Sequence, residues 1–504
     1  MRANPILYFS FVALGVLAYF LQSMTILSSD VSSLLYDTKL FLAGGTYVTD
    51  FFETNPPMIF FIYSPVVLFA KISGMPTSVL VRLYTALLAL LSITCCQILL
   101  KNILNKDDDK LRYVIFFILT FVFLFLPNSD FGQREHFLLI FMMPYLFAAV
   151  LTAQGKPIHP GLAVLIGVMA GFGFGLKPFF LPALVFVELY LIFARRSIMS
   201  CFRIESVICA SMLLIYLAYI FLVHPNYIHI MLPLLFTFYF PSIKESWFVL
   251  LTDSTTIFCF ILLGYYLIFY NKKHYPELTA ILILAFCGMI VAFVLPRTLW
   301  WSHLLPVVGL SCLLVAIFIY QLFYEKIKKG LISNKELSLL IAIGLLMPLM
   351  LCVERAILIV NYNKSFNSNP FIQSLRQANS QSVYCIARGI LCFPLLQDTK
   401  HEFAGRFPLL WWINGLLQME KNSGLTALAQ QQKNFLMNVL IEDLNQQQPQ
   451  TVIVRPTTAK NSFDMLKYLL QDEKFQQVWS QYRYVDTFDD LMVYERINSV
   501  HQAG

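Results

Sequence analysis

Acidic, basic and histidine side chains cluster at the ends of long apolar segments in this chain. The first cluster follows the opening apolar segment and ends in a double proline; it consists of Asp30, Asp37, Lys39, Asp50, Glu53 and then Asn55-Pro56-Pro57. Carboxylates at such a place can accept a proton from a hydroxyl group or help to hold a metal ion. Ionisable residues at a membrane boundary usually mark function, so this cluster is the first candidate site.

A second cluster lies in the segment NSDFGQREH, which contains Asp130, Arg134, Glu135 and His136. Glu135 and His136 could ligate a divalent ion, and Arg134 could bind a phosphate through its planar guanidinium group. The alternative is an interfacial Arg–Glu pair with Asp130 capping a helix. Because neighbouring helical residues diverge by about 100 degrees, all four side chains cannot converge on one point.

Two further candidate sites carry cations in apolar surroundings. Lys177, in GFGFGLKPFFLP, is preceded and followed by long apolar stretches, and Pro178 predicts a helix break beside it. Arg297 and His303, in PRTLWWSHLLP, flank an aromatic pair. The alternatives are a snorkelling lysine and an ordinary interfacial tryptophan belt.

The elements that position these residues are membrane spans. Of 504 residues 58% are hydrophobic and 13% charged, which excludes a single water-soluble globule and indicates a polytopic α-helical membrane protein. About eleven spans are expected, near residues 5–27, 78–100, 111–126, 135–153, 158–175, 178–194, 203–223, 247–270, 277–296, 302–324 and 336–360. The segment 57–70 is short and interrupted by Pro65, so we expect an interfacial or re-entrant helix there.

Charge placement predicts the topology. With these spans and a cytoplasmic amino terminus, most loop Lys and Arg residues fall on one side, as the positive-inside rule requires. The candidate clusters and everything after residue 361 then fall on the opposite side. The net charge of +7 is scattered among short loops, which argues against a nucleic-acid partner.

Composition also predicts two domains, a transmembrane domain over 1–360 and an extracytoplasmic α/β domain over 361–504. The second is more polar and has strand-like runs at 382–386, 451–454 and 491–494. Cys385 and Cys392 lie in it, where an oxidising compartment would allow a disulfide; bridged and free thiols are both open. The glycines at 171, 173 and 175 follow no strand, so we expect them to allow close helix packing.

The first loop resembles the opening pattern of a known family. That family is the membrane glycosyltransferases of the GT-C fold, in particular the branch of the protein O-mannosyltransferases and lipid A aminoarabinose transferases. The matching residues are Asp30, Gly45, Tyr47, Asp50, Glu53, Pro56 and Pro57. The chain departs from the aminoarabinose-transferase version at Val31, where that version has a second acidic residue, and at Asn55, where it has a lysine. Donor identity therefore cannot be copied across.

The resemblance implies transfer of a sugar from a polyprenyl-phosphate carrier to an extracytoplasmic acceptor, with inversion at the sugar carbon. Asp30 would occupy the catalytic position, with Asp50 and Glu53 as further acidic candidates; the alternative for Asp30 is a helix N-cap. Lys177 would contact the carrier phosphate. The other expected donor-phosphate contacts are Arg134, Arg297 and His303, and the tentative metal ligands for a possible divalent ion are Glu135 and His136.

The expected partners are thus a polyprenyl-phosphate-linked sugar, membrane lipid and an envelope acceptor, in a bacterial inner membrane. A transporter or flippase of a lipid-linked saccharide is the main alternative, although transporters usually place ionisable residues near the bilayer midplane. An inactive relative whose C-terminal domain binds a partner is a third possibility.

Overall fold

The computed structural model describes residues 5–105, 108–268, 274–368, 372–373, 375, 381–387, 392–397, 399–422, 424–455, 463–488 and 490–497. Contacts between residues divide the chain into two compact units. Unit 1 comprises Met1–Thr25, Val81–Ala218 and Lys244–Val360, and unit 2 comprises Ile26–Leu80, Tyr219–Ile243 and Asn361–Gly504. One division between the units falls at residue 360, where the sequence suggested a domain boundary, but unit 2 also takes in residues 26–80 and 219–243.

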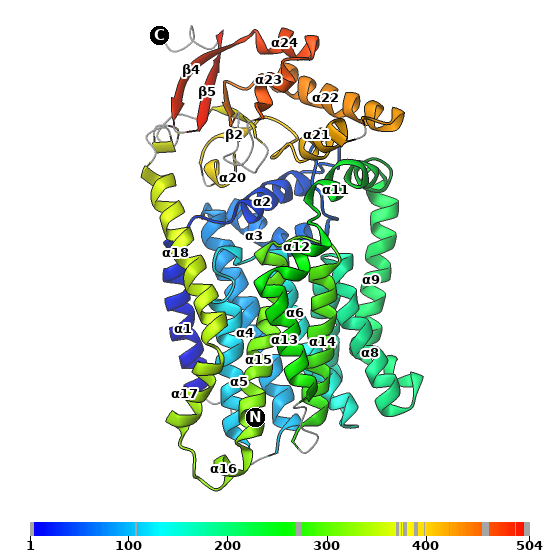
Figure 1. Ribbon diagram of the computed structural model, residues 1–504, viewed down its shortest axis with the longest axis vertical. Helices are drawn as coiled ribbons and strands as arrows, with labels where there is room; N and C mark the ends of the chain where they lie inside the picture. The colour runs from blue at the N-terminus through cyan, green and yellow to red at the C-terminus, as the bar shows by residue number, and fades with distance from the viewer. Residues whose placement is uncertain are drawn as a thin grey trace. The chain divides into compact units, whose positions relative to one another are not determined.

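Unit 1 is a helical bundle (Figure 1). Its helices include α1 (Pro5–Ser23), α5 (Asp109–Leu124), α6 (Arg134–Ala153), α7 (Pro160–Gly175), α8 (Leu181–Arg195), α12 (Trp247–Thr252), α13 (Ser254–Ile268), α14 (Pro276–Val294), α15 (Trp301–Leu322), α16 (Tyr324–Lys328) and α17 (Asn334–Gly344). Three more helices cross the boundaries between the units along the chain: α4 (Thr77–Ile103), α9 (Ile204–Val223) and α18 (Leu346–Ser368). Helix α14 packs against α8, and α15 packs against α5 and α6.

The long apolar helices confirm a polytopic membrane protein. Among the described residues, six helices are long and apolar enough to cross a bilayer: Thr77–Ile103, Arg134–Ala153, Pro178–Arg195, Ile204–Val223, Pro276–Val294 and Trp301–Leu322. Further expected spans are shorter helices or are divided. The span expected at 336–360 consists of two helices that meet at Leu345, and the one expected at 247–270 begins as α12 and continues as α13.

Close packing explains the glycine-rich end of α7, as expected. A β-carbon added at Gly171 would lie 2.8 Å from the Met212 sulfur and 2.9 Å from its Cβ. One added at Gly173 would lie 3.0 Å from the Phe141 Cβ. Small residues therefore let α7 approach its neighbours in the bundle closely.

The N-terminal part of unit 2 consists of helices and an ordered loop. Helix α2 (Ser29–Leu42) ends before Gly44, which adopts a left-handed conformation with φ of 92° just beyond its last turn. The loop leads to α3 (Met58–Ser73), which contains Pro65. A segment expected to be an outer loop is helical instead: π-helical turns η4 (Tyr227–Met231) and η5 (Leu235–Tyr239) alternate with α10 (Leu232–Leu234) and α11 (Phe240–Ile243).

The C-terminal part of unit 2 is built on a five-stranded mixed sheet of order β2-β1-β3-β5-β4. The three strands expected from sequence are present as β1 (Ser382–Ile386), β3 (Thr451–Val454) and β5 (Leu491–Arg496), and β2 (Glu402–Phe403) and β4 (Tyr482–Phe488) complete the sheet. Strand β1 runs parallel to β2 and β3, and β5 runs antiparallel to β3 and β4. The helices of this part are α20 (Cys392–Leu395), α21 (Trp412–Asn422), α22 (Ala427–Gln447), α23 (Met465–Leu469) and α24 (Glu473–Trp479).

A disulfide joins β1 to the segment that follows it. Cys385 and Cys392 are bridged, with their Cα atoms 5.8 Å apart. Of the two possibilities left open by the sequence, the bridge is therefore the one observed. It holds the beginning of α20 against a buried central strand, because Cys385 lies in β1 and is 1% exposed.

Candidate functional site

Lys177 lies at a break between two helices of unit 1. Helix α7 ends at Gly175, and Lys177 is extended (φ −148°, ψ 138°) before the short 3₁₀ helix η2 (Pro178–Phe180) that leads into α8. The break follows from Pro178, which disfavours helical geometry in the residue before it. Because the lysine side chain is only 6% exposed, its charge must be balanced inside the unit.

Glu135 balances that charge. The Lys177 Nζ atom donates a hydrogen bond to Oε1 of Glu135 at 2.5 Å, and the Glu135 side chain is fully buried in the first turn of α6. The Nζ atom is also 3.3 Å from Nε2 of His303, which lies in the first turn of α15. Residues from three separate parts of the chain thus meet at one buried point, which we call the Lys177 cluster.

Thr298 completes the cluster, and Lys177 determines the histidine tautomer. Its hydroxyl oxygen lies 2.5 Å from Nδ1 of His303. A lysine ammonium group can only donate, so Nε2 of His303 must accept from Lys177, and Nδ1 then carries the proton and donates to Thr298. The histidine is therefore neutral in this arrangement. Thr298 was not predicted as a site residue. The only feature of the sequence that could have indicated it is its position between Arg297 and His303.

The Lys177 cluster has the composition of an anion site. Arg134 is 7% exposed and lies one residue before Glu135 in α6, so a second buried cation is close to the Lys177–Glu135 pair. Buried ion pairs are costly to separate, and a cation in a low-dielectric environment interacts strongly with a negatively charged group. A phosphate that approached Lys177 would take over part of the role that Glu135 performs in this structure.

His136 has a separate environment. The Gly132 N–H donates to its Nδ1 at 3.0 Å, and its Nε2 lies 2.8 Å from the carbonyl oxygen of Phe123. Both ring nitrogens are therefore engaged with the backbone, whereas Glu135 is engaged with Lys177. In this conformation the two residues expected to share a metal ion have different partners, as the divergence of neighbouring helical residues requires. Among the described residues, no group of three or more His, Cys, Asp or Glu side chains could hold a metal ion.

Arg297 is directed elsewhere. Its Nε donates to the carbonyl oxygen of Glu245 at 2.9 Å, and its guanidinium carbon lies 4.8 Å from the centre of the Trp247 ring. The left-handed backbone of Arg297 (φ 57°) accompanies this orientation. The structure therefore brings Glu135, Lys177 and His303 together but engages Arg297 with a neighbouring segment.

Asp30 lies in the first turn of α2. Ser28, and not Asp30, occupies the N-cap position of this helix, so the capping explanation for Asp30 does not apply. The residue is partly exposed, and an acidic side chain in the first turn interacts favourably with the helix dipole. Its role as the reacting carboxylate remains a prediction.

The other two acidic candidates organise the loop after α2. Oδ2 of Asp50 accepts a hydrogen bond from the Thr46 N–H at 2.7 Å, and Asp50 is otherwise exposed. Glu53 is 8% exposed and accepts from the backbone N–H and the side-chain amide of Asn55, at 2.8 and 2.5 Å. These bonds shape the turn that precedes the double proline. Asp30, Asp50 and Glu53 belong to unit 2, whereas the Lys177 cluster belongs to unit 1.

Asp37 is the most deeply buried carboxyl group of the first acidic cluster, although the sequence did not single it out as a catalytic candidate. It lies in α2 and is 2% exposed, and its Oδ2 atom has no hydrogen-bond partner among the described residues. Burial, and then the nearby Glu53 carboxylate, raise the pKa of Asp37 well above its ordinary value. The burial of Asp37 could not be inferred from the sequence, because it depends on what packs against α2.

Comparison with known proteins identifies the class of fold. No protein-family model matches the chain, and no curated protein matches it in sequence. The arrangement of the helices and of the C-terminal sheet nevertheless defines a GT-C-like glycosyltransferase fold.

A particular solved structure carries that assignment. The chain is similar to the crystal structure of ArnT from Cupriavidus metallidurans bound to undecaprenyl phosphate, with a TM-score of 0.55. The similarity covers 99% of each chain at 13% sequence identity. The membrane bundle and the C-terminal domain are therefore both part of the shared fold.

Proposed function

We propose that this protein is an integral-membrane glycosyltransferase that moves a sugar from a polyprenyl-phosphate donor to an extracytoplasmic acceptor, a cell-envelope glycan, lipid or protein, with inversion at the sugar carbon. The observation that carries the proposal is the Lys177 cluster: a buried lysine at a helix break, in a chain whose fold resembles over its whole length a protein bound to undecaprenyl phosphate. We further propose a bacterial inner membrane as its location.

Lys177 supplies the main interaction with the leaving phosphate. As the bond between sugar and phosphate breaks, negative charge grows on the phosphate oxygens, and a preorganised cation stabilises that charge more than it stabilises the substrate. Glu135 holds the lysine in place beforehand, and His303 accepts one of its hydrogens. Arg134 adds a second buried cation.

Asp30 is proposed as the base that accepts the proton of the acceptor hydroxyl. It is partly exposed in the first turn of α2, where a carboxylate can be reached by a hydroxyl group and accept its proton. Asp50 and Glu53 are further acidic candidates, and Glu53 also shapes the loop through its hydrogen bonds to Asn55. The residues at Glu135 and His136 do not fit a shared metal ion in this conformation, and no step of the mechanism depends on one.

The position of the cluster favours an enzyme over a flippase. Glu135 and His303 lie in the first turns of α6 and α15, and Lys177 lies just after α7. All three are at helix ends, whereas the ionisable residues of transporters typically lie near the middle of the membrane.

The test is transfer of label from radiolabelled polyprenyl-phosphate sugars to a membrane extract by the purified protein in lipid nanodiscs. Asp30→Asn and Lys177→Ala should abolish transfer. The matched controls are Glu473→Gln, an exposed acid in the first turn of α24, and Lys335→Ala, an exposed lysine in α17, and both should retain it. Saturable carrier binding by the wild type without any transfer would favour the flippase instead.

A further inference from the structure

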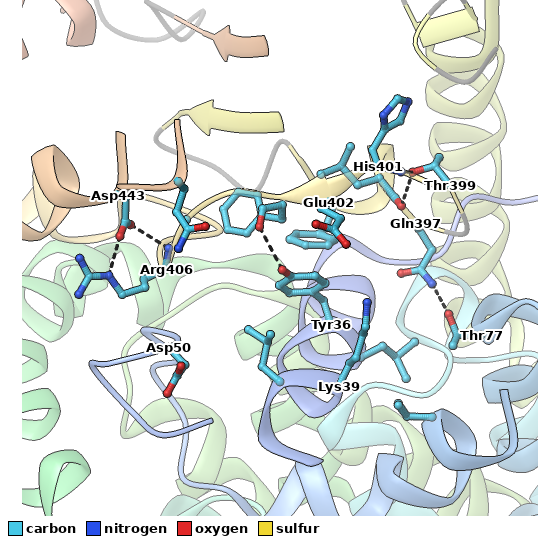
Figure 2. A pocket seen from close by; sticks show the side chains of 18 of the residues that line it. Tyr36, Lys39, Asp50, Thr77, Gln397, Thr399, His401, Glu402, Arg406 and Asp443 are labelled. Atoms are coloured by element: carbon cyan, nitrogen blue, oxygen red, sulfur yellow. Dashed lines mark hydrogen bonds and ion pairs between the residues drawn. The ribbon is translucent and has the colours of Figure 1, made fainter. Parts of the chain in front are cut away.

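Unit 2 contains an open cavity of about 700 Å³. One side is formed by α2 and the loop after it, and the other by the segment 393–406 and the end of α22. Figure 2 shows Tyr36 and Lys39 from α2 together with Glu402, His401 and Arg406 from the C-terminal part of the chain. Cavities of a few hundred to about 1,000 Å³ are typical of small-ligand sites.

Contacts within unit 2 hold the walls of this cavity in place. The Tyr36 hydroxyl donates to the carbonyl oxygen of Phe403 at 3.1 Å, and its ring lies 5.2 Å from that of Phe393. Arg406 binds Oδ1 of Asp443 through its Nε at 2.6 Å and Oδ2 through its backbone N–H at 2.8 Å. These interactions join α2, the 393–406 segment and α22, so the cavity is preorganised.

The exposed polar groups of the lining are mixed in kind. Lys39, Asp50 and Glu402 are exposed, as are the amide side chains of Gln446 and Gln447 at the end of α22. Over the whole lining two cations, Lys39 and Arg406, are set against three carboxylates, those of Asp50, Glu402 and Asp443. The lining is thus not a basic patch, and it differs in this respect from the Lys177 cluster.

This mixture suits a neutral polyhydroxylated ligand. Each sugar hydroxyl both donates and accepts, and the lining offers carboxylate acceptors, an ammonium donor and amides that do both. The half-buried Tyr36 ring, backed by the buried Phe393 ring, adds apolar surface for the C–H face of a sugar. A strongly anionic ligand would meet the excess of carboxylates and be repelled.

We propose that this cavity binds a neutral oligosaccharide, the glycan portion of the acceptor. The inference rests on the proposed transferase function, because only then does a sugar bound here become an acceptor. The residues that select it are Glu402, Gln446 and Gln447, which are exposed and make none of the contacts that hold the walls together.

The experiment measures binding of neutral oligosaccharides, the gluco-, manno-, galacto- and N-acetylglucosamine di- and trisaccharides, to the full-length protein in nanodiscs by saturation-transfer NMR. At least one should bind the wild type. The double variant Gln446→Ala/Gln447→Ala should weaken that binding by about tenfold, as expected for two lost hydrogen bonds, and Glu402→Ala should weaken it as well. The control Gln431→Ala changes an exposed glutamine of the same helix that does not line the cavity, and should bind like the wild type.

Two further probes distinguish other ligand classes. The assignment to a glycan is overturned if inorganic phosphate or an uncharged serine- and threonine-containing peptide binds the wild type but not the double variant, while oligosaccharide binding is the same in both. The same holds if no oligosaccharide binds the wild type, or if all variants bind one equally.

Undecaprenyl phosphate binding to the same preparations separates this proposal from the transferase function. Lys177→Ala should lose binding of the lipid phosphate and keep binding of the oligosaccharide. The Gln446→Ala/Gln447→Ala variant should keep binding of the lipid phosphate and bind the oligosaccharide more weakly. If the wild type bound the oligosaccharide but no lipid phosphate, the transferase proposal would fail and the sugar site would stand. If it bound the lipid but no oligosaccharide, only the sugar site would fail.

Discussion

At the scale of single residues, the chemistry of this protein depends on charges that are buried in compensating arrangements. Glu135 is completely buried and Lys177 nearly so, and each is tolerated because the other is present. The Lys177 side chain is held by a group that a phosphate could replace. A buried charge that would be costly alone is therefore held in a fixed position, as the proposed phosphate contact requires.

The mutual dependence of this pair predicts a non-additive effect on stability. Lys177→Met or Glu135→Leu alone leaves one buried charge uncompensated and should cost about 3–5 kcal/mol. The double variant, which leaves neither charge, should be more stable than either single variant. Thermal unfolding in detergent measures the stability of the wild type, the two single variants and the double variant. Lys335→Met, which changes an exposed lysine, is the control. Additive losses would show that the two charges do not depend on one another.

Asp37 predicts a pH dependence of stability. Because the folded state raises the pKa of Asp37, the folded protein binds more protons than the unfolded chain between the ordinary and the raised pKa. The stability contributed at this position is therefore greatest at low pH and is lost as the pH rises through that window. Melting temperatures measured from about pH 4 to about pH 8 should fall less steeply for Asp37→Asn than for the wild type.

Asp37→Asn should also be the more stable of the two at neutral pH, since the variant buries no charge. Glu473→Gln, which changes an exposed acid in the first turn of α24, is the control. Parallel curves for wild type and Asp37→Asn would mean that Asp37 does not titrate as proposed.

At the scale of elements, helix packing in unit 1 depends on specific small residues. A β-carbon added at Gly288 of α14 would lie 2.3 Å from the Cα and 2.5 Å from the backbone nitrogen of Ala183 in α8. Those atoms cannot move without displacing a helix. By contrast, nothing lies within 4 Å of the corresponding position at Gly264 in α13.

This contrast predicts that a Gly→Ala substitution has different effects on stability at the two positions. Gly288→Ala should separate α14 from α8 and lower the melting temperature, with a loss of about 1–3 kcal/mol typical of overpacking. Gly264→Ala has room and gains helix propensity, worth up to about 1 kcal/mol in an exposed helix, so it should be neutral or stabilising. Melting temperatures of the two variants in one detergent settle the comparison; equal losses would contradict the close approach.

At the scale of the whole molecule, the two compact units divide the chain differently from the two domains expected along the sequence. Within unit 2 the first loop and the C-terminal part bind one another directly. The Phe52 N–H donates to the carbonyl oxygen of Arg406 at 3.0 Å, and the Phe52 ring packs against Phe407 with centroids 4.2 Å apart. The polar C-terminal segment and the first loop are consequently parts of one body.

This organisation predicts that damage to the C-terminal part spreads to the first loop. Arg406→Met leaves the carboxylate of Asp443, which is 3% exposed, without its cation, and should cost about 3 kcal/mol or more. Hydrogen exchange should then rise around residues 50–53 as well as in α22. The exposed pair of Arg483 and Glu495 provides the control: Arg483→Met should change little, as is usual for surface pairs. Faster exchange confined to residues after 361 would contradict the prediction.

Much of the fold could be predicted from local sequence. Apolar length located the spans, short strand-like runs located β1, β3 and β5, and Pro178 located the break at Lys177. Each is a property of a few consecutive residues. The helical segment 227–243 and the interruption at Leu345 were not predicted, because their interpretation depends on what packs against them.

The residues of the candidate site could be predicted from the sequence, but their arrangement could not. The sequence indicated three of the site residues, Lys177, Glu135 and His303. A charged or polar side chain near an apolar segment is costly, so it usually has a functional role. Their convergence, the role of Thr298 and the different orientation of Arg297 depend on contacts between residues far apart in the chain.

The sequence by itself determined that this is a polytopic membrane protein with a polar C-terminal part, because hydrophobic length and charge placement are dictated by the bilayer. Only the tertiary structure decided which charges meet, that Asp37 is buried, and that the first loop and the C-terminal sheet form one compact unit. The physical reason is that hydropathy acts on consecutive residues, whereas a hydrogen bond or an ion pair requires two groups within a few ångströms, wherever they stand in the chain.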